Sequence, residues 1–254
     1  MIVDALILAG GSSKGLEREG EPAKAFIKIN GKSMLEHVAE SLKSSKSVRR
    51  VAVVGPPAMR DQSEKSGADI FLPTKGSLTE NMSLGLAELN SSYPVLIASS
   101  DIPLITPEAI DDFVNRCEKI QADIFYSVVD RERIEKFFPG TKRTYAALRE
   151  GTFTGGNVGL VNPRVVRENM ELIERAFKLR KSPVKLVRIL GLRFVLKFIF
   201  RRLTLGEVEE RVSLLLNSKG RAVVTPYPQI GIDVDKVSDL ELVRRFFQGG
   251  QTKN

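Results

Sequence analysis

Apolar runs alternate with helical patterns along this chain. Near-continuous apolar runs predict buried strands at 2–9, 50–55, 70–72, 95–99, 123–129 and 221–225. Apolar residues at three- and four-residue steps predict helices at 34–42, 79–89, 107–121, 163–181, 204–216 and 237–247. Because strands separated by helices pair in parallel through right-handed crossovers, we expect an α/β fold. The expected architecture is a three-layer α/β/α sandwich around a Rossmann-like, mostly parallel sheet.

The composition is that of a globular protein. Of 254 residues, 42% are hydrophobic and 28% are charged, which excludes the disordered, collagenous and coiled-coil classes. The single cysteine, Cys117, cannot form an intramolecular disulfide, and residues 1–9 have the pattern of a strand and not of a leader. The longest strongly apolar stretch, 190–200, contains Arg193 and Lys197 and is shorter than the roughly 20 residues of a membrane span. We therefore expect a cytoplasmic protein.

The positive charge is concentrated in one segment. Residues 175–206 hold ten Lys and Arg and no Asp or Glu, which leaves 29 basic and 31 acidic residues in the rest of a chain of net charge +8. A near-neutral body argues against general binding of polyanions. The segment also lacks Tyr and Trp for base stacking, so no nucleic-acid partner is expected.

The first strand is followed by a glycine-rich turn, LAGGSSKG at 8–15. It is not a P-loop, because Gly10 and Gly15 have the spacing but Leu16 follows where lysine is needed. It is not a dinucleotide fingerprint either, because Ser12 stands where the middle glycine should be. Two interpretations remain: a tight strand-to-helix turn without a ligand, or a turn whose backbone N–H groups bind a base edge and phosphate oxygens.

Carboxylates follow other predicted strands. Asp101 comes just after the strand at 95–99, at the carboxyl edge of the sheet, where ligands of such sheets bind. One aspartate there suits Mg²⁺, which takes a few carboxylates and fills its other positions with water and phosphate oxygens, although a turn-capping role is the plainer alternative. Asp233 and Asp235 are expected on a late strand at 231–235, and residues 154–158 (TGGNV) are expected to form a flat glycine turn.

Other catalytic chemistries find no support in the sequence. His37, the only histidine, falls in the first amphipathic helix, and Cys117 also lies on a helix. Both are expected to be structural residues. Serine–histidine and zinc chemistry are therefore not expected.

Five motifs, in order, resemble one family. They are LAGG at 8–11, PAKAFIKINGKSML at 22–35, SSDIPLITPEAI at 99–110, GGN at 155–157 and IDVDKVSDL at 232–240. Together they resemble the MobA-like nucleotidyltransferases, which include molybdenum cofactor guanylyltransferases, methylerythritol phosphate cytidylyltransferases and sugar-1-phosphate nucleotidyltransferases. The resemblance implies a fold of the nucleotide-diphospho-sugar transferase type. It also implies a single nucleotidyltransferase domain over 1–254, with a basic helical insertion at about 170–220.

The resemblance also implies roles for individual residues. Lys24 would neutralise triphosphate charge, and Asp101 and Asp233 would bind Mg²⁺ beside Asp235. The base and ribose would be held by Leu8, Ala9, Gly10, Gly11 and Ser12, with Gly76, Ser77, Asn81 and Ser83 completing the pocket. Gly156 and Asn157 would face the acceptor.

The implied reaction is Mg²⁺-dependent transfer of an NMP group from an NTP, CTP or GTP, to a phosphorylated small-molecule acceptor with release of pyrophosphate. One position departs from the family pattern: Gly15 stands where an arginine usually contacts the leaving phosphates. Lys14 could act instead as a point charge, and if it does, Gly15→Arg is expected to recover some of the rate of a Lys14→Ala variant. The departure leaves an alternative open, a non-catalytic nucleotide-binding or regulatory protein of the same fold.

The basic segment is amphipathic. Val187, Leu190, Phe194 and Phe198 recur at helical steps among its cations. Three interpretations stay open: the apolar face packs on the sheet or on a second subunit in a homodimer, it covers the acceptor pocket, or residues 175–206 make a peripheral contact with an anionic membrane.

Overall fold

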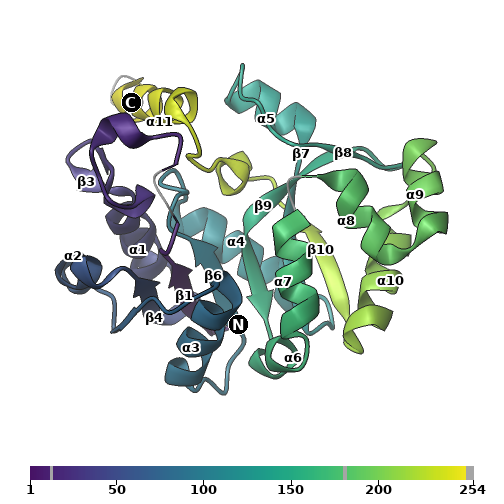
Figure 1. Cartoon of the computed structure of the whole chain (residues 1–254), viewed down its shortest axis with the longest axis horizontal. Coiled ribbons are helices and arrows are strands. Elements are labelled where there is room, and N and C mark those ends of the chain that lie inside the picture. The colour runs from purple at the N-terminus through teal and green to yellow at the C-terminus, as the bar shows by residue number, and fades with distance from the viewer. Residues whose placement is uncertain (12–13, 180–181, 250–254) are drawn as a thin grey trace.

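The fold is organised around one central sheet (Figure 1). The computed structural model describes residues 1–11, 14–179 and 182–249. Within them the sheet has the order β10-β7-β9-β6-β1-β4-β5, with β8 paired to β9, and β2 and β3 form a separate hairpin. The strands are β1 (Val3–Leu8), β2 (Lys28–Ile29), β3 (Lys32–Ser33), β4 (Val48–Gly55), β5 (Ile70–Pro73), β6 (Val95–Ser99), β7 (Ile124–Asp130), β8 (Ala146–Ala147), β9 (Thr152–Val161) and β10 (Gly220–Val224).

The sheet is mostly parallel. β1 pairs in parallel with β4 on one side and β6 on the other, and β7 pairs in parallel with β10. β9 is the exception, because it runs antiparallel between β6 and β7. The predicted fold class is confirmed.

Helices cover both faces of this sheet. They are α1 (Met34–Ser44), α2 (Arg60–Lys65), α3 (Leu78–Leu89), α4 (Pro107–Glu118), α5 (Arg131–Phe137), α6 (Pro163–Glu168), α7 (Met170–Leu179), α8 (Pro183–Leu190), α9 (Leu192–Ile199), α10 (Leu205–Leu216) and α11 (Val237–Gly249). Short 3₁₀ helices lie at Glu17–Glu19 (η1), Lys24–Phe26 (η2), Pro57–Met59 (η3) and Pro228–Gly231 (η4).

The alternation of side chains along β1 creates the layers. Ala5 and Ile7 face the cluster that includes α1 and α4, whereas Leu6 faces the cluster that includes α3 and α6. β1 is thus apolar on both faces, as its continuous apolar run predicted. Ser33 begins α1 as predicted, in a capping box with Glu36.

Two local predictions are wrong. Residues 154–158 are not a turn but part of β9, where a Cβ at Gly155 or Gly156 would collide with Tyr126 or Ser127 of β7. The glycines therefore allow β7 and β9 to approach each other, and do not mark a turn. Residues 232–235 are not a strand but an extended segment between η4 and α11.

The predicted helix at 163–181 is two helices. Asn169 lies between α6 and α7 with φ −128°, outside the helical region, and its amide donates to the carbonyl of Val165. Residues 180 and 181, the end of that prediction, lie outside the described residues.

The basic segment includes the end of α7 and forms α8 and α9, which pack against α10 and against Leu148 directly after β8, apart from the apolar clusters that cover the two faces of the central sheet. Their buried residues Val187, Leu190 and Leu203 form a satellite apolar cluster with partly buried residues of α9 and α10. Across the described ranges, no helix combines the length and the hydropathy needed to span a membrane.

Candidate functional site

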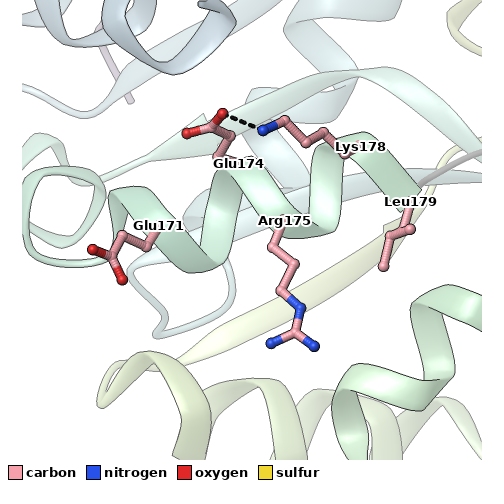
Figure 2. Close-up of a pocket in the computed structure, with 5 residues that line it drawn as sticks. All are labelled: Glu171, Glu174, Arg175, Lys178 and Leu179. Atoms are coloured by element: carbon pink, nitrogen blue, oxygen red, sulfur yellow. Dashed lines mark ion pairs between the residues drawn. The ribbon is translucent and has the colours of Figure 1, made fainter.

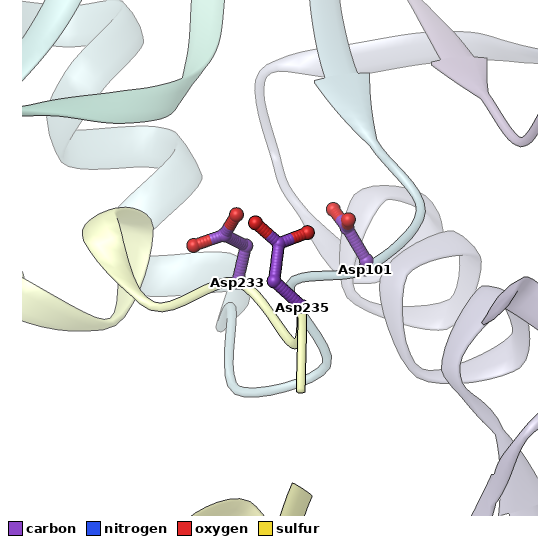
Figure 3. Close-up of side chains that lie close together, drawn as sticks. All are labelled: Asp101, Asp233 and Asp235. Atoms are coloured by element: carbon purple, nitrogen blue, oxygen red, sulfur yellow. The ribbon is translucent and has the colours of Figure 1, made fainter. Parts of the chain in front are cut away.

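Three carboxylates meet at the carboxyl edge of the sheet (Figure 3). One oxygen from each of Asp101, Asp233 and Asp235 lies within 4.8 Å of the others. All three side chains are half-buried, and Figure 3 shows their carboxylates directed to the same side. The two predicted metal ligands, Asp101 and Asp233, are therefore brought together with Asp235.

The end of β6 positions Asp101. The strand stops at Ser99, whose hydroxyl donates to the Asp101 carboxylate. The Asp101 carbonyl accepts the N–H of Val234 at 2.9 Å. This backbone bond fastens the turn after β6 to the segment that carries the other two aspartates.

Alternation along the extended segment orients the other two carboxylates. Ile232 and Val234 are fully buried in an apolar cluster that also contains residues of α5 and α11. Because side chains alternate in extended backbone, Asp233 and Asp235 point away from that cluster, toward Asp101. Burial of Ile232 and Val234 thus orients the side chains of Asp233 and Asp235 between and after them.

Lys24 joins two of the carboxylates. It lies in η2, is buried, and its ammonium is 2.7 Å from Asp101 and 2.5 Å from Asp235. A third bond reaches the carbonyl of Val234 at 3.2 Å. Burial by itself would lower the pKa of Lys24, but the two carboxylates raise it above its ordinary value. The ammonium is therefore charged at neutral pH.

Arg143 is a residue of this site that the sequence did not reveal. It lies between α5 and β8, and its guanidinium bonds the Asp233 carboxylate and, at 2.8 Å, the Asp233 carbonyl. Its side chain is only 8% exposed, which makes this a desolvated pair. A lone arginine in a polar loop carries no local signal for such a contact, since the loop is 90 residues away along the chain.

The site carries an excess of negative charge. Three carboxylates face the two cations Lys24 and Arg143. Burial raises the pKa of the Asp233 carboxyl, Arg143 opposes that rise, and the charges of Asp101 and Asp235 add to it. Oxygen donors in carboxylate excess are the ligands that hard divalent cations prefer, so the residues present fit a divalent metal ion.

The glycine-rich turn adjoins this site. A Cβ on Gly11 would lie 3.5 Å from Cε of Lys24, and one on Gly10 would lie 3.2 Å from Thr74 and 3.6 Å from the Asn81 amide nitrogen. The structure therefore brings together Gly10, Gly11, Lys24 and Asn81, as predicted for a nucleotide site. Leu8 ends β1 and Ala9 is buried, whereas Ser12 lies outside the described residues.

The predicted pocket residues at the start of α3 make contacts that stabilise the helix and its neighbours. Ser77 caps the helix in a capping box with Glu80, and Gly76, at φ +59°, leaves room for the Glu80 carboxylate. Asn81 is buried and accepts the Lys75 N–H at 2.6 Å. Ser83 instead faces α7, where its hydroxyl contacts Met170.

The predicted acceptor residues lie near η4. The Asn157 amide donates to the carbonyl of Ile230 at 3.2 Å, and Gly156 also faces Ile230. Since η4 leads directly to Ile232 and Asp233, these contacts connect β9 with the segment that carries the carboxylates.

The structure argues against the Gly15→Arg substitution that was expected above to recover activity. Its φ is +89°, and a Cβ would lie 2.9 Å from the Asp235 carbonyl. A side chain there would strain the loop that holds Asp235, so the expected rescue by Gly15→Arg is corrected. Lys14 is exposed. The pKa of the Glu17 carboxyl is lowered mainly by hydrogen bonds from the backbone N–H groups of Gly15 and Glu17, and to a smaller extent by the charge of Lys14.

A hollow lies on α7, apart from the carboxylates. It is lined by Glu171, Glu174, Arg175, Lys178 and Leu179 (Figure 2). Glu174 pairs with Lys178 at 2.6 Å and accepts a bond from Thr79 in α3 at 3.3 Å, while Figure 2 shows Arg175 directed away from that pair. One helix surface supplies the lining, so the chemistry of the carboxylate site is the better guide to function.

The chain is a mostly parallel α/β/α sandwich with an acidic cluster and a buried lysine at the carboxyl edge of its sheet, where sheets of this kind bind their ligands. A family model described as the MobA-like NTP transferase domain matches residues 5–175. The chain belongs to the MobA-like NTP transferase family, so the predicted family and enzyme class are confirmed.

Curated relatives match the chain in part. A probable molybdenum cofactor guanylyltransferase of Natranaerobius thermophilus is 32% identical over 130 residues, which are 50% of this chain and 60% of that protein. A 2-C-methyl-D-erythritol 4-phosphate cytidylyltransferase of Corynebacterium jeikeium is 34% identical over 98 residues, 38% of this chain and 35% of that protein. Each match spans less than two thirds of the relative's own length.

Solved structures match over nearly the whole chain. A hypothetical transferase from Thermus thermophilus has a TM-score of 0.82 and 38% identity, and the match covers 94% of this chain and 100% of that one. A CMP:2-keto-3-deoxy-manno-octonic acid synthetase complexed with CTP has a TM-score of 0.64 at 16% identity, over 98% of this chain and 100% of that one. The second likeness supports the nucleotide-diphospho-sugar transferase fold alone.

Proposed function

We propose that this protein transfers an NMP group from an NTP to a phosphorylated small-molecule acceptor, with release of pyrophosphate. The observation that carries the proposal is the cluster of Asp101, Asp233 and Asp235 around the buried ammonium of Lys24. In a family of NTP transferases, such a cluster supplies both a metal site and a fixed positive charge.

The reaction needs little covalent chemistry from the protein. An oxygen of the acceptor phosphate attacks the α-phosphorus, and the bond from that phosphorus to the bridging oxygen of pyrophosphate breaks. The attacking phosphate is already ionised at neutral pH, so no general base is required. The protein aligns the two substrates and neutralises the charge that develops on them.

Mg²⁺ is the proposed metal, held by Asp101 and Asp233. When bound, it would neutralise phosphate charge and fix the triphosphate relative to the acceptor. Lys24 would then exchange one of its carboxylate bonds for a phosphate oxygen, since its ammonium has only three donors.

The remaining site residues divide between the two substrates. Gly10, Gly11 and Asn81 adjoin one another and Lys24, which suits the base, ribose and phosphates of a nucleotide. Lys14 is proposed for the leaving phosphates, because it is an exposed cation on the same turn. On the acceptor side we propose Gly156 and Asn157 together with Arg143, whose buried Nε has no partner within the described residues.

The names of relatives suggest which NTP is the donor. They include a guanylyltransferase and cytidylyltransferases, so we propose GTP or CTP as the donor. We also propose that the whole chain forms one domain with a helical insertion at about 170–220, and that it acts in the cytoplasm.

A nucleotide-by-acceptor screen for pyrophosphate release tests this function. Each of the four NTPs is combined with a panel of sugar, polyol and alcohol phosphates, with and without Mg²⁺. The expected result is Mg²⁺-dependent release with one NTP, absent in Asp101→Asn and retained in Asp61→Asn, an exposed surface control. Calorimetric NTP binding without turnover on the whole panel would favour the regulatory alternative.

A further inference from the structure

Helix α9 has two apolar faces. One packs inward, where Phe194, Val195 and Phe198 join the satellite cluster of α8 and α10. The other is open: Leu192, Leu196, Ile199 and Phe200 are 74%, 51%, 59% and 69% exposed. Their spacing of four, three and one residues aligns them along one side of the helix and its end. We call these four residues the exposed stripe.

Cations border the exposed stripe. Arg193 lies one step around the helix from Leu192, and Arg201 and Arg202 follow directly after Phe200. All three are exposed and make no ion pair within the part of the chain that the structure describes. Lys197 differs, because it pairs with Glu207 of α10. Arg193 also lines a hollow with Glu207 and Glu210 of α10, so the positive charge at the border of the stripe comes mainly from Arg201 and Arg202.

We propose that the exposed stripe is a docking surface for an anionic lipid bilayer. Leucine, isoleucine and phenylalanine side chains insert at the boundary between headgroups and acyl chains, and arginines beside them bind lipid phosphates. A helix of eight residues is too short to span a bilayer, so α9 would lie flat on its surface. Its inward face stays packed in the satellite cluster, so docking requires no unfolding.

The charge pattern disfavours a second copy as the occupant. A two-fold contact through the exposed stripe would bring Arg193, Arg201 and Arg202 against the same residues of the other copy. No acidic residue occurs between 175 and 206 to compensate them, and Glu207, the next acidic residue along the chain, already pairs with Lys197. An anionic bilayer offers both the apolar phase and the opposite charge.

The docking surface is connected to the candidate active site. The carbonyl of Leu203, just after α9, accepts the N–H of Arg149 at 2.9 Å, and Glu150 accepts the N–H of Leu205 at 3.1 Å. Arg149 and Glu150 follow β8, and the loop before β8 carries Arg143, which bonds Asp233. These bonds join the end of α9 to the residues after β8, so docking would act on the segment whose preceding loop reaches Asp233. In Figure 1, α9 lies at the opposite end of the molecule from α2.

Vesicle co-sedimentation tests the proposal. The full chain is mixed with phosphatidylcholine vesicles, or with the same vesicles containing phosphatidylglycerol, at low salt. We expect binding to the anionic vesicles only, released at about 0.5 M NaCl, where charges are screened within about 4 Å.

Three variants locate the contact. Replacing Leu192, Leu196 and Ile199 with Ser removes three of the four apolar residues of the exposed stripe, and replacing Arg193, Arg201 and Arg202 with Glu reverses the charge of its border. Each is expected to lower the partition coefficient at least about tenfold. The matched control replaces Lys46, Lys65 and Lys119 with Glu, the same charge change at exposed positions of other elements, and is expected to bind like wild type.

Three results would overturn the proposal. The first is equal binding to neutral and anionic vesicles, or none to either. The second is an equal loss in the control variant, which would indicate general charge attraction. The third is a dimer in sedimentation velocity without lipid that the Leu192, Leu196 and Ile199 variant dissociates, which would assign the stripe to a second copy. Thermal melts identify a misfolded variant. If the Leu192, Leu196 and Ile199 variant is misfolded, the proposal is judged on the Arg193, Arg201 and Arg202 variant, because those residues lie outside the core.

Discussion

The two ends of strand β1 carry clusters of opposite charge balance. At its start, Asp4 is fully buried and bonds both Arg49, at 2.7 Å, and Arg50, at 3.0 Å. At its carboxyl end, beside the neighbouring strand β6, three aspartates share Lys24 and Arg143. The first cluster has more cations than carboxylates, and the second has more carboxylates than cations.

The carboxyl pKa values follow this balance. Burial by itself would raise the pKa of Asp4, but hydrogen bonds from Arg49 and Arg50 lower it to about 2. Burial raises the pKa of Asp233, and a single arginine does not reverse the rise. Removing the carboxylate from a buried cluster with a cation surplus leaves uncompensated positive charge and destabilises the fold, whereas a carboxylate surplus costs stability until a ligand brings more positive charge. On this comparison we propose that Asp4 and its arginines stabilise the fold and that the three aspartates at the other end bind the substrates.

The largest expected effect comes from the acidic end. Asp101→Asn is expected to lower nucleotidyl transfer at least about a thousandfold, because it removes a ligand charge and weakens the hold on Lys24. Pyrophosphate release measures the loss, and circular dichroism checks the fold. Asp233→Asn should behave similarly, more mildly where Asp235 compensates. Near-normal Mg²⁺-dependent turnover in folded Asp101→Asn would remove this residue from the site.

Arg143 tests whether the acidic end depends on its second cation. Arg143→Gln is expected to lower turnover up to about a hundredfold, since it leaves Asp233 buried without its partner. Arg143→Lys, which keeps the charge without the fork, should recover part of the rate. In an Asp233→Asn background, Arg143→Gln should cost little more if the arginine acts through that carboxylate. An equal loss in both backgrounds would show that Arg143 acts directly on the acceptor, the role proposed above for its buried Nε.

Asp4 tests the basic end. Asp4→Asn is expected to lower the free energy of unfolding by about 2 kcal/mol, a modest figure because both arginines are partly exposed, with the rate of transfer unchanged. The melting temperature should fall by about 4–8 °C. Loss of activity in a stable Asp4→Asn protein would contradict the division between the two ends.

The same variant has a pH signature. The folded pKa of Asp4, about 2, lies below the ordinary value of 3.8, so its contribution to stability is present above that ordinary value. The contribution is lost as the pH falls toward the folded pKa. Asp4→Asn should therefore show a shallower fall in stability between these two values than wild type in acid-unfolding curves.

The smallest expected effect is stabilisation by Mg²⁺, which tests both ends of β1. Mg²⁺ at about ten times its dissociation constant is expected to add about 1.4 kcal/mol, which raises the melting temperature by about 3–6 °C. NaCl at equal ionic strength serves as the control. The rise should persist in Asp4→Asn and disappear in Asp101→Asn. An equal rise in both variants would assign the metal to another part of the chain.

Local patterns in the sequence predicted most elements of the sheet and its helices. The apolar runs at 2–9 and 95–99 became β1 and β6, and Ser33 caps α1. These predictions succeeded because burial on both faces of a strand, or on one face of a helix, leaves a period in the residues themselves. The TGGNV segment at 154–158 was misassigned, because its glycines serve contacts with β7 that no local period records.

The sequence by itself determined the family, through its ordered motifs, and the identity of Lys24, Asp101 and Asp233 as candidate site residues. Only the tertiary structure decided how they meet: Lys24 bonds Val234 across 210 positions, and Arg143 reaches Asp233 across 90. Strand order brings the carboxyl ends of β1 and β6 together, and burial of Ile232 and Val234 turns the alternate aspartates toward them. Charge balance at a site is a sum over such distant neighbours, so it is a property of packing and not of any one segment.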